Sequence, residues 1–320
     1  MRKEQITFEA SAGGGNLIAG FFCPRDDGNV RSKGVIQICH GMAEYFGRYD
    51  EMIGYLNANG FDVCGMDMMG HGATYELNKG RDMPLGYFGD VSDSYMCILK
   101  DEMNLHAKAK ERFGDDIPYF LYGHSMGSFV ARNIYITPEY SKEFEAFVFS
   151  STMGPNPAAG AGLALTGIMK LFGAKSKPGK LVNSIAFGTY NKKIDNPKTD
   201  FDWVTSDETE VAKYMSDPLA GFLFTNKGFT DLFELVLRMQ KKDALDAVPP
   251  EKKVLLTFGE DDPVGDYGKG PRAVCDSLRA KGVNAEARSY GHYRHEIQHE
   301  PVRGQYFEDI ARFFEEAARS

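Results

Sequence analysis

One serine stands between two glycines in residues 122–128, which read Y-G-H-S-M-G-S. The core of this segment has the G-x-S-x-G spacing of a nucleophile elbow, in which a serine occupies a sharp turn between a strand and a helix. The glycines let strand and helix approach each other closely around the strained serine backbone. An apolar run precedes the segment and an amphipathic pattern follows it. We therefore predict that Ser125 is a nucleophile, with a helix-capping serine as the alternative.

Three of the seven histidines lie beyond the last predicted strand: His292, His295 and His299. A serine nucleophile needs a base, and after this kind of elbow the order along the chain is serine, acid, histidine. We select His295, in the sequence Y-R-H-E, and keep His292 as the alternative.

The other four histidines fit the role of base less well. His106 lies within a helix rich in lysine and glutamate and is predicted to be solvated. His124 belongs to the elbow but is expected to point away from Ser125. His40 and His71 precede glycines at strand ends, where structural hydrogen bonds are expected.

The acid is expected in residues 259–264, G-E-D-D-P-V, directly after an apolar strand. A carboxylate here has to accept the Nδ1–H of the histidine and stabilise the imidazolium that forms. Asp262, next to Pro263, is the best placed. Asp261 is a competitor, and Glu260 is less favoured.

Two backbone amides are predicted to hold the oxyanion. One is that of Met126, at the amino end of the helix after the serine, where the helix dipole also favours negative charge. The other is that of Met42, in the loop of residues 40–45 that follows a buried strand. Both donors are main-chain groups, so the methionine side chains need no special chemistry.

The elements that must position these residues alternate along the chain. Strands are predicted at residues 5–10, 16–22, 34–39, 61–66, 119–122, 144–150, 253–258 and 284–290, and helices at residues 48–59, 92–113, 126–137, 270–281 and 303–318. Such alternation predicts an α/β fold with a mostly parallel sheet covered on both faces. The rhythm stops between residues 151 and 240. We predict a core made of residues 1–150 and 241–320, with residues 151–240 inserted as a cap.

Composition narrows the class of protein. The net charge of −8 argues against nucleic-acid binding. The start of the sequence lacks the apolar stretch of a signal peptide, and no window approaches the length of a membrane span. Five widely spaced cysteines predict free, buried thiols and a cytoplasmic protein.

Residues 295–299, H-E-I-Q-H, also match the zinc signature H-E-x-x-H. On a helix this spacing would place two imidazoles on one face, with Glu315 or Glu316 as an imaginable third ligand. Pro301 disfavours a continuous helix through the motif. We therefore predict no metal and no cofactor.

Several segments together resemble the monoglyceride lipase and lysophospholipase-like branch of the α/β hydrolases, of serine aminopeptidase S33 type. They are residues 40–49, 65–72, 122–128, 259–264 and 294–296. The resemblance implies an α/β-hydrolase fold, with an eight-stranded, mostly parallel sheet flanked by helices and an inserted cap. It also implies Asp262 rather than Asp261 as the acid, and it supports His295.

The resemblance gives two further residues a role. In that family a glutamate and an arginine of the H-G-x-G-E-H-x-x-R-Y loop help to hold the polar head of a glycerol ester, and Glu44 and Arg48 occupy those places. A loop salt bridge is the alternative. The sequence departs from the family pattern in two places. Ala43 and Tyr45 replace a glycine and a histidine, and Met68 and Met69 stand where a His-Arg pair is usual.

The expected cap is rich in apolar side chains. Its phenylalanines are candidates either for an acyl-chain slot or for the cap's own core: Phe172, Phe222, Phe224, Phe229 and Phe233. The patch at residues 162–173, with Lys170 and Lys175 at its rim, is a candidate for weak, reversible contact with a lipid surface, without stable membrane insertion.

The expected activity is hydrolysis of a small-molecule carboxylic ester through an acyl-enzyme, with monoacylglycerol-like or lysophospholipid-like substrates implied by the resemblance. The alternatives are a short-chain or aryl carboxylesterase, and an amide or peptide hydrolase of the same fold. A catalytically inactive binding protein is a further alternative, and covalent labelling of Ser125 distinguishes it.

Overall fold

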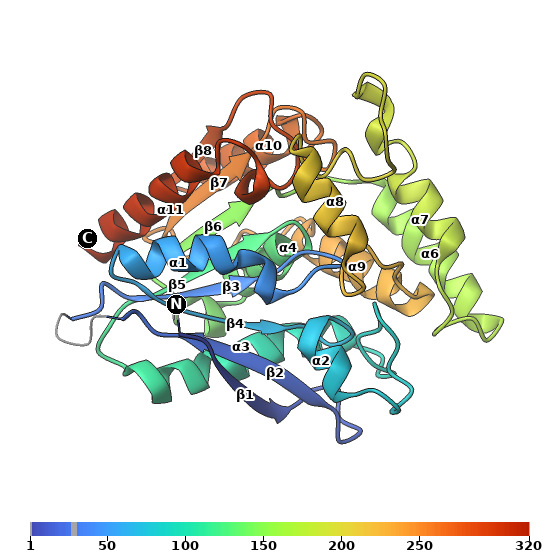
Figure 1. The fold of residues 1–320 in the computed structure, drawn as a ribbon, viewed down its shortest axis with the longest axis horizontal. Coiled ribbons are helices and arrows are strands. Elements are labelled where there is room, and N and C mark those ends of the chain that lie inside the picture. The colour runs from blue at the N-terminus through green and yellow to red at the C-terminus, as the bar shows by residue number, and fades with distance from the viewer. Residues whose placement is uncertain (1, 27–30, 320) are drawn as a thin grey trace.

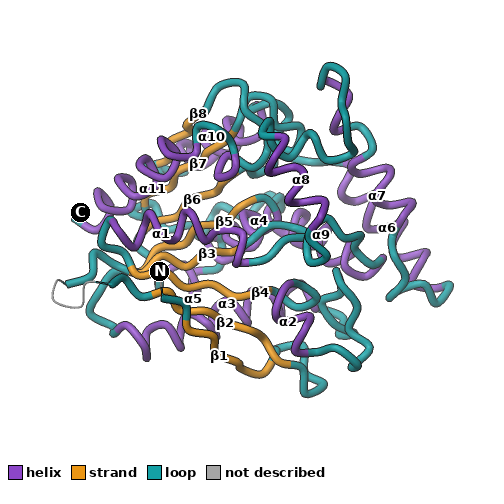
Figure 2. The backbone as a smooth tube through the Cα atoms, viewed as in Figure 1, coloured by secondary structure: helices purple, strands orange, loops and turns teal. Residues whose placement is uncertain are grey.

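The computed structural model of the chain describes residues 2–26 and 31–319. These residues form a single eight-stranded sheet with helices on both sides (Figures 1 and 2). The strand order is β1-β2-β4-β3-β5-β6-β7-β8. The strands are β1 (Glu4–Glu9), β2 (Leu17–Cys23), β3 (Val35–Cys39), β4 (Asp62–Asp67), β5 (Tyr119–His124), β6 (Ala146–Ser150), β7 (Lys253–Phe258) and β8 (Ala285–Ser289). β2 is antiparallel to both of its neighbours, and the six strands from β4 to β8 run parallel. The predicted fold class is confirmed.

The composition of each strand follows its place in the sheet. The central strands β3, β5 and β6 are buried along their whole length, as parallel strands covered on both faces must be, and they read as nearly continuous apolar runs. In the edge strand β1 every second residue is exposed, namely Gln5, Thr7 and Glu9. This is the period of two expected of a strand with one covered face.

Two apolar cores cover the two faces of the sheet. On one face lie α1 (Asp50–Ala58) and α11 (Arg303–Ala318). The other face is covered by α3 (Ser94–Phe113), α4 (Met126–Tyr135) and α10 (Lys269–Ala280). Two short helices that the sequence did not predict are α2 (Gly72–Leu77) and α5 (Pro138–Ser141).

Four helices lie between β6 and β7: α6 (Ala158–Leu171), α7 (Lys180–Phe187), α8 (Glu208–Ser216) and α9 (Asn226–Met239). Figure 1 shows α6 and α7 at the far end of the molecule, beyond the ends of the parallel strands. α9 packs against α6 and also against α3 and α4 of the core. The division into a core and a cap stays a prediction.

The patch predicted at the end of α6 is exposed. Leu171 and Phe172 leave 85% and 83% of their surface accessible. Ile168 and, on α7, Leu181 and Ile185 are exposed as well. Contact of these residues with a lipid surface stays a prediction. Among the described residues, no helix has the length and hydropathy needed to cross a bilayer.

The environment predicted for His106 is wrong. Its side chain is buried, with 2% of its surface exposed, and its ring contacts Tyr119 and Phe144 at centroid distances of 4.8 and 4.6 Å. It lies on the face of α3 that carries Leu99 and Glu102 toward the sheet, so the helical period outweighs its charged sequence neighbours. The five cysteines are free and buried, as predicted.

Candidate active site

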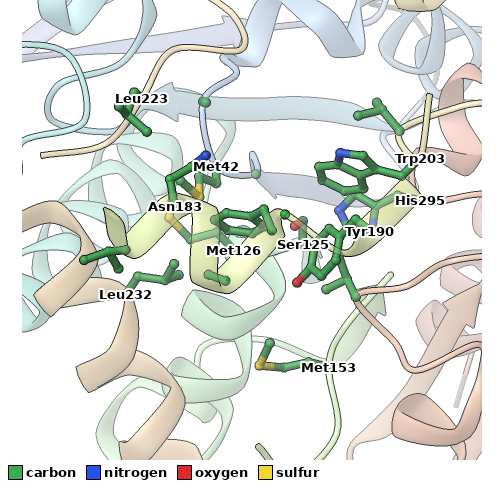
Figure 3. A pocket seen from close by; sticks show the side chains of 18 of the residues that line it. Met42, Ser125, Met126, Met153, Asn183, Tyr190, Trp203, Leu223, Leu232 and His295 are labelled. Carbon is green, nitrogen blue, oxygen red and sulfur yellow. The ribbon is translucent and has the colours of Figure 1, made fainter. Parts of the chain in front are cut away.

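The predicted reactive residues follow the carboxyl ends of four parallel strands of the sheet. Ser125 follows β5, Asp262 lies beyond β7, His295 beyond β8, and Met42 beyond β3. Because parallel strands end at the same edge of a sheet, their loops meet there. Figure 3 shows Ser125 and His295 next to each other at the wall of one cavity.

The backbone at Ser125 has the geometry of the predicted elbow. Its φ of 51° and ψ of −120° lie in a region that non-glycine residues rarely occupy. The turn is held by the Ser125 N–H, which donates to the Ser150 carbonyl at 3.0 Å. A Cβ at Gly127 would lie 2.0 Å from the Cys39 carbonyl oxygen, and one at Gly123 would lie 2.3 Å from the Gly127 oxygen. Glycine is therefore required on both sides of the serine.

His295 and Asp262 form the predicted pair. His295 Nδ1 lies 3.0 Å from Asp262 Oδ1, and the carboxylate is fully buried. The same oxygen accepts from the Val264 amide at 2.9 Å. Burial lowers the pKa of His295, but the charge and hydrogen bond of Asp262 outweigh this effect and raise it. A proton on Nδ1 leaves Nε2 as the acceptor that can serve Ser125.

The rejected candidates pair with each other at the surface. His292 Nδ1 lies 3.3 Å from Asp261 Oδ1, and their side chains are 85% and 50% exposed. Glu260 instead accepts from the Ser289 hydroxyl at 2.7 Å. The geometry therefore favours Asp262 and His295.

The two predicted oxyanion donors border the same cavity. Met126 is the first residue of α4, so its N–H has no acceptor within the helix. Met42 lies in the loop after β3, directly after Gly41. A Cβ at Gly41 would lie 3.2 Å from the Ser125 Cβ, so this loop closely approaches the serine.

Glu44 and Arg48 form the loop salt bridge that was the alternative to a head-group contact. Arg48 Nη1 donates to Glu44 Oε2 at 2.9 Å, while Glu44 Oε1 accepts from the Gly41 N–H and from the Tyr49 hydroxyl. Burial raises the pKa of Glu44 to about 7, against the attraction of Arg48. Ala43, which replaces the family's glycine, has a φ of 54°, the left-handed conformation that glycine adopts without strain.

Sequence reasoning missed Glu296, which binds Arg48 with both carboxylate oxygens at 2.6 and 2.7 Å. Its sequence signals were the zinc-like motif and its place in the family-like segment 294–296, and neither gave it this role. Residues 297–299 of that motif form a single 3-10 turn rather than an α-helix. Its two histidines face different carboxylates, since His295 binds Asp262 and His299 lies 3.7 Å from Glu210.

Two aromatic residues near the site were also missed. The Trp203 ring contacts the His295 ring at 5.2 Å, and Tyr190 packs edge-on against Trp203 at 5.0 Å. The backbone between α7 and α8 also contacts the histidine loop, because the Glu296 N–H donates to the Val204 carbonyl at 2.7 Å. No motif marks these residues, since their role depends on how the segment folds over the sheet.

A mostly apolar cavity of about 880 Å³ opens beside Ser125. It is lined by the oxyanion loop, by the first turn of α4, and by residues of α6, α7 and α9, including Leu165, Val182, Phe187, Leu232, Phe233 and Val236. The predicted phenylalanines divide into three groups. Phe222 and Phe233 line the cavity, Phe224 and Phe229 are buried in the core, and Phe172 is exposed.

Comparison with known proteins places this geometry among hydrolases. The chain matches the profile of the family described as serine aminopeptidase, S33, over residues 30–302. A monoacylglycerol lipase of Mycolicibacterium smegmatis is 25% identical over 94% of this chain and 93% of its own length. A monoglyceride lipase of Saccharomyces cerevisiae is 23% identical over 86% of this chain and 82% of its own length.

Solved structures extend the comparison. The fold is similar to that of a highly thermostable carboxyl esterase from Bacillus coagulans in complex with glycerol, with a TM-score of 0.89, 26% identity and 99% of both chains covered. A soluble variant of the Saccharomyces cerevisiae monoglyceride lipase, in complex with a substrate analog, shares the fold at a TM-score of 0.73 and 18% identity, with 99% of this chain and 95% of that chain covered.

Proposed function

The chain belongs to the serine aminopeptidase S33 family of α/β hydrolases, and on this basis we propose that it hydrolyses monoacylglycerol-like esters through an acyl-enzyme on Ser125. One observation carries the proposal. An elbow serine and a histidine paired with a buried carboxylate meet at the wall of an apolar cavity.

In the acylation step His295 acts first as a base. Its Nε2 takes the proton of the Ser125 hydroxyl while the oxygen attacks the ester carbonyl carbon. The amides of Met42 and Met126 donate to the oxyanion, and the amino end of α4 adds its dipole. Asp262 stabilises the imidazolium. His295 then gives the proton to the leaving alcohol, and the acyl-enzyme remains.

Deacylation repeats the same steps with water. His295 takes a proton from the water as it attacks the acyl-enzyme, the same amides hold the second oxyanion, and Ser125 regains its proton when the acid leaves. No metal and no cofactor enters this scheme.

The shape and polarity of the cavity support a substrate with an acyl chain. Apolar side chains from α6, α7 and α9 form one wall, and the volume lies within the range of small-molecule sites. We assign this wall to the cap of residues 151–240. Two of the relatives are named as lipases of monoacylglycerols. Lysophospholipid-like esters, which also carry a single acyl chain, are the second substrate class that we propose. Glu44 borders the cavity, but its oxygens bind Gly41, Tyr49 and Arg48 within the loop, so the contact with a head group that the resemblance implies stays a prediction.

A cytoplasmic location is part of the proposal. All five cysteines are free and buried, which suits a compartment that keeps thiols reduced.

The direct kinetic test is Ser125→Ala. We expect it to abolish hydrolysis of p-nitrophenyl butyrate and of monoacylglycerols while leaving the thermal unfolding transition in place. Ser141→Ala, a buried serine on α5, is the matched control and keeps its turnover. Near-normal turnover of a folded Ser125→Ala variant would contradict the proposal.

A further inference from the structure

Two loops that carry proposed catalytic groups are joined by one buried arginine. The first loop, residues 40–45, presents the Met42 amide, and the second, residues 291–296, presents His295. Arg48 binds Glu44 of the first loop at 2.9 Å and Glu296 of the second at 2.6 and 2.7 Å. The side chains of the three residues are between 2% and 9% exposed.

On the oxyanion side, Glu44 determines the shape of the loop. Its Oε1 accepts from the Gly41 N–H, one residue before Met42, and from the Tyr49 hydroxyl at 2.8 Å. Its Oε2 is left for Arg48. One carboxylate thereby connects the two sides of the turn that contains Ala43, whose backbone is left-handed. If the Glu44 side chain rotated, the Gly41 N–H would lose its acceptor. The next residue, Met42, would then no longer be held in place.

On the histidine side, Glu296 is the residue next to His295. Burial raises the pKa of Glu296, but the charge and hydrogen bonds of Arg48 outweigh burial and lower it. The ion pair joins two guanidinium nitrogens to both carboxylate oxygens, a two-point contact that lysine cannot reproduce. The guanidinium also lies over the Tyr214 ring of α8 at 4.7 Å, so it is enclosed from the other side.

A buried ionic cluster is a poor way to gain stability, because desolvation offsets the attraction and apolar residues of the same volume often stabilise as much. The cluster instead holds the two loops at a fixed position relative to each other, because Arg48 binds a carboxylate of each. Arg48 does not line the cavity, whereas its partners Glu44 and Glu296 do. Arg48 therefore acts through the two loops rather than on the substrate.

We propose that Arg48 is a positioning residue for the hydrolysis reaction: by binding Glu44 and Glu296 together it fixes the Met42 amide and the His295 imidazole in one geometry around Ser125. This role rests on the function proposed above. Glu296 is then part of the positioning machinery rather than of a metal site.

The test measures steady-state hydrolysis of the soluble ester p-nitrophenyl butyrate by four variants: Arg48→Met, Arg48→Lys, Glu44→Gln and Glu296→Gln. A displacement of catalytic groups by about 1 Å costs on the order of 10- to 100-fold in rate. We expect kcat to fall by that factor in Arg48→Met, with KM changed by less than about threefold because the acyl pocket is untouched. Arg48→Lys restores only part of kcat.

A control separates positioning from general loss of stability. Lys227 and Asp231 form another buried ion pair, with side chains 6% and 0% exposed, that does not line the cavity. Lys227→Met should lower the melting temperature and leave kcat within about twofold of the wild type, since the loops at the site keep their contacts. If Arg48→Met does not fold, Glu296→Gln serves in its place, because it keeps the side-chain volume and one acceptor oxygen while removing the charge and the second acceptor for Arg48.

The decisive result is the combination of Glu44→Gln with Glu296→Gln. If Arg48 couples the loops, the double variant loses less kcat than the product of the single losses, and neither change lowers kcat further in Arg48→Met. Multiplicative losses, or near-normal kcat in folded Arg48→Met and Glu296→Gln, would overturn the proposal. Failure of the proposed function has a different signature, namely activity that survives in Ser125→Ala.

Discussion

Replacing Asp262 with asparagine tests which of two adjacent aspartates serves the histidine. The change keeps the side-chain volume and removes the charge that lies 3.0 Å from His295 Nδ1. The new amide can donate to Nδ1, which favours the tautomer with the proton on Nε2. His295 then cannot accept the proton of Ser125.

The size of the effect follows from the geometry. At about 4 Å and an effective dielectric constant of about 20, opposite unit charges attract each other by about 4 kcal/mol. Loss of that attraction to the imidazolium in the transition state slows the reaction about a thousandfold. The unfavourable tautomer adds to this loss, so we expect kcat to fall by about 10³ to 10⁴; the same change in a serine protease triad lowers kcat by about 10⁴.

Steady-state hydrolysis of p-nitrophenyl butyrate measures this loss, with Asp261→Asn as the matched control. Asp261 is half-exposed and pairs with His292 at the surface, so its variant should keep kcat within about twofold of the wild type. The reasoning is refuted if Asp262→Asn stays within about tenfold of the wild type, or if Asp261→Asn shows the large loss.

Three further predictions concern the wild-type site, the cavity and the core. Asp262 raises the pKa of His295 above its ordinary value of 6.5, and the imidazole must be neutral to act as a base. We therefore expect kcat/KM to fall as the pH drops through an inflection above 6.5. An inflection below 6.5 contradicts the assignment. Leu232→Trp fills the cavity from α9 and should reduce kcat/KM for a monoacylglycerol with a long chain far more than for p-nitrophenyl acetate; an equal loss on both esters argues against the acyl slot. Burial raises the pKa of Glu102 to about 8, against the hydrogen bond from Gln37, so its stabilising effect is complete below the unfolded value of about 4.5 and is lost as the pH rises through the folded value. Urea unfolding should therefore show Glu102→Gln to be more stable than the wild type at pH 8 but not at pH 4, and a constant difference across this range contradicts it.

The parts of the site that local sequence determines were predictable. The elbow needs glycine at two fixed positions because the backbones of β5, α4 and the β3 loop meet there, and Gly123 and Gly127 satisfy this need within four residues of each other. The central strands are buried on both faces and therefore appear as apolar runs.

The sequence could not predict the features of the site that depend on side-chain orientation or on contacts between residues far apart in the chain. Asp261 and Asp262 are adjacent in one turn, and only the fold turns the second toward His295 and the first toward solvent. Arg48 and Glu296 are 248 positions apart, so no spacing links them. His106 shows the converse error, since charged neighbours in sequence indicated solvent while the helical face placed it in the core.

The central claim is that Ser125 carries the acyl group. It is tested most directly by treating the wild-type protein with a fluorophosphonate, digesting it, and locating the added mass by tandem mass spectrometry. We predict one adduct, on Ser125, formed in proportion to the loss of esterase activity. An adduct on another residue, or full activity after stoichiometric labelling of Ser125, would contradict it.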